Sequence, residues 1–145
     1  MKPRINISKV APKAIEAMIG LEKYIHASGL DKTIYELIKT RASQINGCAY
    51  CINMHTRDAI KLGETTQRLF VLDAWRETQL YTEKDRAALA LTEAMTLIAG
   101  KEVPDDIYDN AASLFTEQEL AAIIMTIVTI NAWNRISITS RTPLD

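Results

Sequence analysis

Apolar residues recur at helical spacing along nearly the whole chain. Ile15, Met18, Leu21 and Ile25 are three or four residues apart and define one face of a helix expected over residues 12–29. Strict alternation of apolar and polar residues between turn signals, which a half-buried strand would show, is not convincing anywhere. The pattern therefore predicts an all-α fold of about six to seven helices.

Capping residues and glycines mark the ends of the other expected helices. Thr82 with Asp85, and Thr116 with Glu119, have the spacing of capping boxes. The expected helices after the first are residues 31–46, from the cysteines to 63, 66–75, 82–100, a short helix from 104, and a long helix from 116.

The long helix from residue 116 is apolar on most of its circumference, notably over 122–130. Its most apolar stretch, 120–133, is too short to span a bilayer and contains Thr126, Thr129 and Asn131, so we interpret it as buried and expect no membrane insertion. A helix that is apolar all round must be covered on all sides. In so short a chain a second subunit can supply part of that cover, and we expect a homo-oligomer.

Length and charge narrow the class of protein. The 145 residues suit one domain over 1–145, and the 48% hydrophobic and 24% charged residues indicate a globular chain. Lys and Arg number 17 and Asp and Glu 18, so the net charge of -1 gives no electrostatic reason to expect nucleic acid as a partner. The amino terminus has no apolar run of the secretory type, and we expect a cytoplasmic protein.

The only two cysteines, Cys48 and Cys51, follow an Asn46-Gly47 break and precede His55. The positive end of a helix dipole and its unpaired N–H groups stabilise a thiolate at such a position. Residues i, i+3 and i+7 share a helical face, so we expect the two thiols and the imidazole to line up. In a reducing compartment this pair is typical of catalytic, redox-sensing or metal-binding sites.

Two structural alternatives compete with redox chemistry. Cys48, Cys51 and His55 could provide three zinc ligands and Glu36 a fourth, although structural zinc sites commonly use two ligand pairs and the chain has no second pair. The cysteines could also be small buried hydrophobic residues. Glu36 taken alone would usually be a solvated helix-surface residue.

The spacing Glu36-x11-Cys48-x2-Cys51-x3-His55 resembles the signature of the alkylhydroperoxidase D-like branch of the carboxymuconolactone decarboxylase superfamily. The flanking text is also similar, and consists of 41–51, 54–59, Trp75-Arg76-Glu77 and 131–135.

The resemblance implies an all-helical thiol peroxidase that works without haem, flavin or metal and assembles as trimers or hexamers. It implies that Cys51 attacks hydrogen peroxide or a small organic hydroperoxide, that Cys48 resolves the sulfenic acid as a disulfide, and that His55 and Glu36 relay protons. Helix position alone would favour Cys48 as the more reactive thiol, since it is nearer the helix start. A thioredoxin-like protein, a lipoyl domain or a low-molecular-weight thiol would supply the electrons.

One residue departs from the family pattern. Tyr50 stands between the cysteines where the founding alkylhydroperoxidases have a second histidine, and a phenol is a poor base at neutral pH. Alternatives to peroxide turnover are a redox-sensing oligomer, a zinc-structured module, and lactone decarboxylation, whose branch of the superfamily lacks the cysteine pair. We expect His26 to be structural, and Arg76 and Arg135 to tie helices together.

Overall fold

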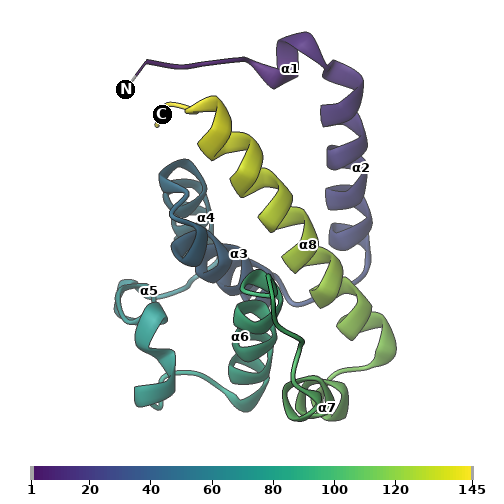
Figure 1. Cartoon of the computed structure of the whole chain (residues 1–145). Helices are drawn as coiled ribbons and strands as arrows, with labels where there is room; N and C mark the ends of the chain where they lie inside the picture. Colours follow the sequence, from purple (N-terminus) through teal and green to yellow (C-terminus); the bar gives the residue numbers. More distant parts are fainter. Residues whose placement is uncertain (1, 145) are drawn as a thin grey trace.

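The computed structural model describes residues 2–144, and these residues form helices joined by short loops (Figure 1). The helices in chain order are α1 (Ile7–Val10), α2 (Pro12–Ala27), α3 (Lys32–Asn46), α4 (Ala49–Lys61), α5 (Thr66–Phe70), the 3-10 helix η1 (Leu72–Glu77), α6 (Glu83–Thr96), α7 (Asp105–Leu114) and α8 (Glu117–Ser140). The predicted all-α class is confirmed for this part of the chain.

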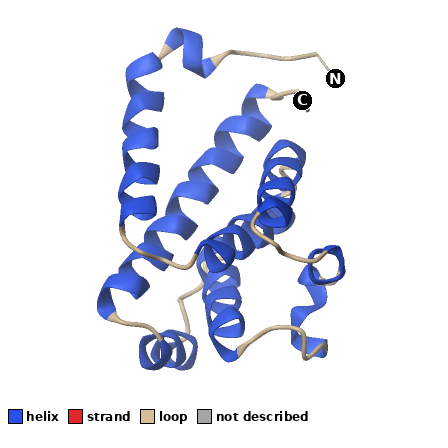
Figure 2. Ribbon diagram, turned by 180° about the vertical axis from the view of Figure 1, so that it is seen from behind, coloured by secondary structure: helices blue, strands red, loops and turns tan. Residues whose placement is uncertain are grey.

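Helix α8 is the long central element, and α2 runs beside it (Figures 1 and 2). Helix α3 makes the most extensive contacts, with α4, α6 and α8. Ile38, Leu91, Ile123 and Ile127 are buried where α3, α6 and α8 meet. The two termini lie side by side, because the Arg4 N–H donates to the Ser140 carbonyl oxygen at 2.9 Å.

The single helix predicted over 66–75 is wrong in detail. It is divided into α5 and η1, and the backbone leaves helical geometry at Ala74. Leu69, Leu72 and Trp75 are all buried at a spacing of three residues. A 3-10 helix aligns positions i and i+3, so this spacing is better matched by η1 than by a continuous α-helix. The short helix α1 was not predicted.

Helix α8 is only partly covered within its own subunit. Among the described residues it is the one helix long and apolar enough to cross a membrane, a property that core helices share. Ile123, Ile127 and Ile130 are fully buried, whereas Val128 is 46% exposed. Helix α2 also presents Ile19 to solvent.

This incomplete cover motivates a prediction about assembly. Light scattering at micromolar concentration is expected to give a mass that is a multiple of the 16.2 kDa of one chain. Val128→Glu is expected to lower that mass, because a charge within an apolar contact remains unpaired. Phe70→Glu is the matched control, since Phe70 is exposed on α5, away from α8. A mass of 16.2 kDa for the unmodified protein would contradict the prediction.

Candidate redox site

The two cysteines lie at the turn from α3 to α4. Gly47 has φ 72°, a left-handed conformation that glycine adopts readily, and it ends α3. Cys48 is the residue that caps α4, and its Sγ accepts a hydrogen bond from the Cys51 N–H at 3.3 Å. The two cysteines form a disulfide with a Cα–Cα distance of 5.3 Å.

Side-chain amides, of which that of Asn134 is fully buried, hold this turn against α8. The Asn46 amide donates to the side-chain oxygens of Asn131 and Asn134, at 2.9 Å each. Asn134 in turn donates to Ser43 Oγ at 2.9 Å, and Ser43 accepts the Cys48 N–H on its carbonyl oxygen at 3.0 Å. Polar groups inside a protein need hydrogen-bond partners, and this network satisfies several of them. It thereby fixes the position of Cys48 at the start of α4.

His55 and Glu36 form a buried pair beside Cys51. His55 Nδ1 and Glu36 Oε2 are 2.8 Å apart, and both side chains are less than 10% exposed. In the tautomer in which Nδ1 donates this hydrogen bond to the Glu36 carboxylate, Nε2 carries no hydrogen and can act as a base. The alternative of Glu36 as a solvated surface residue is therefore wrong: it is buried among α3 and α4.

Cys51, His55 and Glu36 line one cavity of about 390 Å³. Ile130 and Trp133 of α8 and Met54 of α4 contribute apolar walls. Cys48 does not line this cavity, so the predicted common face of both thiols and the imidazole holds for Cys51 and His55 only. The reason is that Cys48 precedes the first turn of α4 and has extended backbone geometry.

The cavity contains a second polar cluster that sequence reasoning missed. Glu22 of α2 accepts hydrogen bonds from Tyr35 Oη at 2.6 Å and Trp133 Nε1 at 3.0 Å. It also pairs with Lys39 Nζ, which lies over the Tyr35 ring at 4.6 Å from its centroid. Tyr35 and Lys39 flank Glu36 on α3, but no local signal connects them with Glu22.

The charges of this cluster depend on each other. Burial acts to raise the pKa of Glu22, but the Lys39 ammonium and the hydrogen bonds from Lys39, Tyr35 and Trp133 hold that pKa below its ordinary value. Burial lowers the pKa of Lys39, and Glu22 opposes the shift. Burial and the hydrogen bond to Glu22 raise the pKa of Tyr35, which keeps the phenol protonated.

Lys39→Met is expected to lower the free energy of unfolding at pH 7 by about 3–5 kcal/mol, because it leaves the Glu22 carboxylate buried without its counter-ion. The side chains of Lys39 and Glu22 are 2% and 16% exposed. The matched control is Lys61→Met, whose pair with Asp58 is 70% and 40% exposed. That change is expected to alter stability by under about 1 kcal/mol.

The pH dependence of this effect has a definite sign. The folded pKa of Glu22 is below its ordinary value of 4.5, so its contribution to stability is present above pH 4.5 and is lost as pH falls through the lower folded pKa. Urea unfolding of Lys39→Met and Lys61→Met, at fixed protein concentration, at pH 7 and in acid, measures the free energy of unfolding of each. An equal loss of this free energy in the two variants would contradict the prediction.

Other residues singled out from the sequence have structural partners. Arg76 pairs with Glu93 of α6, as expected for a tie between helices. Arg135 instead donates to Asn131 within α8, at 2.9 Å to the carbonyl oxygen. His26 lines the cavity and packs on Tyr35 with ring centroids 4.9 Å apart, a place in the site that the sequence did not predict. Tyr50 also lines the cavity.

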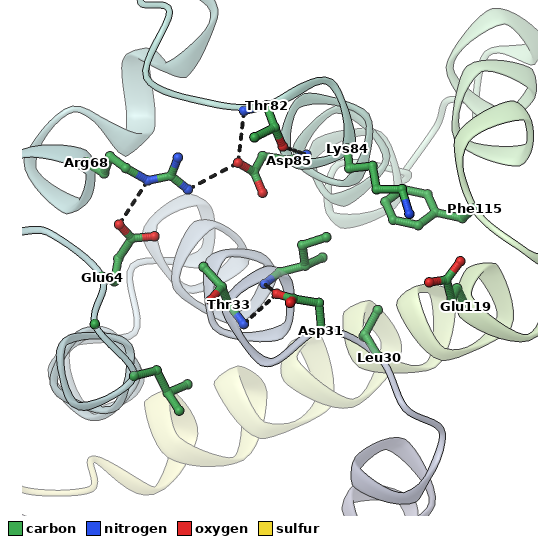
Figure 3. A pocket seen from close by; sticks show the side chains of 13 residues that line it. Leu30, Asp31, Thr33, Glu64, Arg68, Thr82, Lys84, Asp85, Phe115 and Glu119 are labelled. Carbon is green, nitrogen blue, oxygen red and sulfur yellow. Dashed lines mark hydrogen bonds and ion pairs between the residues drawn. The ribbon is translucent and has the colours of Figure 1, made fainter.

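A larger cavity of about 670 Å³ lies at the start of α3 and α6 (Figure 3). Two of its charged groups serve the fold: Asp31 accepts from Thr33 N–H at 2.9 Å as the cap of α3, and Asp85 accepts from Thr82 N–H at 3.0 Å in the capping box of α6, whose cap is Thr82. Arg68 lies between Asp85 and Glu64. We assign this cavity a structural role.

The described part of the chain contains no set of side chains that matches the zinc site considered from the sequence. Within residues 2–144, no group of three or more His, Cys, Asp or Glu side chains is arranged to hold a metal ion. In the disulfide form, Cys48 and Cys51 are not available as thiolates.

The chain belongs to the Carboxymuconolactone decarboxylase family, whose sequence profile matches residues 12–94. An uncharacterised protein of Bacillus subtilis strain 168, YdfG, is 45% identical over 138 residues, which are 95% of this chain and 94% of that protein. YnjA of Escherichia coli K12, also uncharacterised, is 26% identical over 67% of this chain and 54% of its own.

Within the family the chain is AhpD-like. A crystal structure from Agrobacterium tumefaciens, of a protein of unknown function connected by name with the antioxidant defence protein AhpD, has a TM-score of 0.95 and 40% identity over 99% of both chains. The debrominase Bmp8 has a TM-score of 0.82 at 21% identity, over 92% of this chain and 72% of its own, and shares the fold. The expected family and fold are confirmed.

Proposed function

We propose that the protein is a thiol-dependent peroxidase that reduces hydrogen peroxide or small organic hydroperoxides through the Cys48–Cys51 pair. The observation that carries this proposal is that Cys51, bonded to Cys48, shares a cavity with His55, whose Nδ1 is 2.8 Å from Glu36. The AhpD-like fold is consistent with antioxidant chemistry.

In the reduced protein, His55 Nε2 takes the proton of the Cys51 thiol, and Glu36 stabilises the imidazolium that forms. The thiolate attacks one oxygen of the peroxide, the O–O bond breaks, and the leaving oxygen receives the proton from His55. Cys51 is then a sulfenic acid. The Cys48 thiolate attacks its sulfur and releases the oxygen as water, after protonation, to give the disulfide. Two thiols of a reductant restore the pair and leave as a disulfide.

The cavity explains how this cycle can operate with Tyr50 between the cysteines. His55 and Glu36 provide a base and its carboxylate partner without any group at position 50. Tyr50 lines the cavity, where a phenol can donate a hydrogen bond to a bound peroxide.

The experiment is peroxide consumption by purified protein with dithiothreitol as reductant. We expect multiple turnovers, and mass spectrometry of protein treated with one equivalent of peroxide should show the loss of two hydrogens. A single oxidation without turnover, coupled to a change in oligomer mass, would instead support a redox sensor. Intact thiols after stoichiometric peroxide would contradict both functions.

The remaining expectations about cellular partners follow from this proposal. The physiological reductant is a low-molecular-weight thiol, a thioredoxin-like protein or a lipoyl group, and the protein acts in the cytoplasm as a homo-oligomer, a trimer or hexamer. The chemistry requires no metal, haem or flavin.

A further inference from the structure

The two cysteines of the disulfide face different cavities. Cys51 lines the cavity of about 390 Å³ with His55, whereas Cys48 lines a second cavity of about 670 Å³. Only Tyr50 and Ser137 contribute to both, so these two residues form the boundary between them. Each cysteine of the disulfide therefore borders a separate space, and both are almost fully buried, Cys48 being 1% and Cys51 2% exposed.

The two cavities differ in charge. Three carboxylates, those of Glu22, Glu36 and Asp58, line the cavity that contains Cys51, together with one cation, Lys39, which is paired with Glu22. The cavity at Cys48 is lined by Arg4 and Arg141, and no carboxylate occurs among its described lining residues. Neither arginine forms an ion pair within residues 2–144.

Both arginines are held in place by the end of α8. The Arg4 side chain donates to the Thr139 carbonyl oxygen at 3.3 Å. Arg141 ends α8 with φ 54°, the one positive φ of a non-glycine residue in the described chain. Glycine is the usual residue at such a helix end, and another residue there costs about 1 kcal/mol.

We propose that the cavity at Cys48 binds the reductant, and that this reductant is a small thiol carrying a carboxylate or phosphate. The cavity at Cys48, at about 670 Å³, is the larger of the two and lies within the range of about 300–1,000 Å³ that is usual for ligand pockets. The inference rests on the proposed peroxidase function and specifies its electron donor.

The chemistry gives a reason for this division. The thiolate of the reductant attacks Cys48 Sγ, a bond forms between the two sulfurs, and the Cys48–Cys51 bond breaks. The leaving group is the Cys51 thiolate, which lies in the cavity of His55 and can be stabilised by its imidazolium. A second thiol then attacks the mixed disulfide, releases Cys48 as a thiolate and leaves as the oxidised reductant.

The test compares three thiols of similar size and different charge: 3-mercaptopropionate, 2-mercaptoethanol and cysteamine. Rates of disulfide reduction are compared at equal thiolate concentration and low salt. We expect the anionic thiol to react roughly tenfold faster than the neutral one, and the cationic thiol to react slowest. Added salt is expected to reduce the difference. In acid-quenched samples the mixed disulfide is expected on Cys48.

The variant is Arg4→Gln combined with Arg141→Gly. Glycine relieves the positive φ at position 141, so a slower reaction cannot be attributed to strain at the end of α8. We expect this variant to lose the preference for the anionic thiol and to keep its rate of oxidation by peroxide. Arg57→Gln with Lys101→Gln removes the same charge from exposed positions outside this cavity and is expected to keep the preference.

Equal rates for the three thiols, a mixed disulfide on Cys51, or fastest reduction by neutral dihydrolipoamide regardless of the arginines would each overturn the inference. In those cases the peroxidase cycle with dithiothreitol would still operate. If no thiol supports peroxide turnover, the proposed function itself fails.

Discussion

Cys51→Ser is expected to abolish peroxide consumption, whereas Cys48→Ser should still react with one equivalent of peroxide. Cys51 shares its cavity with His55 and Glu36, and Cys48 faces a different cavity. Without Cys51 the base has no thiol to activate. Without Cys48 the first oxidation proceeds, but the sulfenic acid on Cys51 has no thiol to resolve it.

The two substitutions are well matched for stability. Cys48 caps α4 through its side chain, and serine is a favoured residue at a helix start, so Cys48→Ser retains a hydrogen-bond acceptor for the Cys51 N–H. Both variants lose the same disulfide. A difference in reactivity between them therefore reports on the chemistry of the two sulfurs.

Trapping with a dimedone-type reagent measures this division of roles. The adduct is expected on Cys51 in the Cys48→Ser variant, with far-ultraviolet circular dichroism confirming that both variants are folded. An adduct found only on Cys48, in the Cys51→Ser variant, would reverse the assignment and favour the thiol nearer the helix start.

The fold was largely predictable because its signals are local. Helix caps such as Thr82, Thr116 and Asp31 involve residues two or three positions apart, and each cap is present in the structure. The end of α3 at Gly47 is likewise set by one residue. The division between α5 and η1 was missed because it depends on how Trp75 is buried by other helices.

The candidate site was predictable only in part. The proximity of Glu36 and His55, 19 residues apart, came from the resemblance to a family and not from helical spacing. Glu22 was missed because its partners are 13, 17 and 111 residues away, and only the packing of α2 on α3 and α8 brings them together. The separation of Cys48 from Cys51 into two cavities likewise depends on tertiary packing.

His55→Ala is expected to slow peroxide consumption by roughly 10²- to 10⁴-fold, the usual contribution of general acid–base catalysis. The substitution removes the base that takes the Cys51 proton and the acid that protonates the leaving oxygen. It also removes the imidazolium that stabilises the thiolate, so the reaction should require a higher pH. Rates measured from pH 5 to pH 9 with saturating dithiothreitol test both effects.

Glu36→Gln is expected to have a smaller effect in the same direction. The glutamine amide oxygen can still accept the hydrogen bond from His55 Nδ1, which preserves the ring orientation, but the negative charge that stabilises the imidazolium is lost. Glu93→Gln is the matched control. Glu93 is a largely buried carboxylate paired with Arg41 and Arg76, outside the cavity, and its replacement should leave the rate and pH profile unchanged.

The double variant distinguishes a relay from two independent effects. Since Glu36 acts through His55, the loss in His55→Ala combined with Glu36→Gln should be smaller than the product of the two single losses. The coupling is obtained from the four rates of the cycle at one pH. If Glu36→Gln retains the full rate and an unchanged pH profile in a folded protein, the 2.8 Å contact is structural and the relay does not operate.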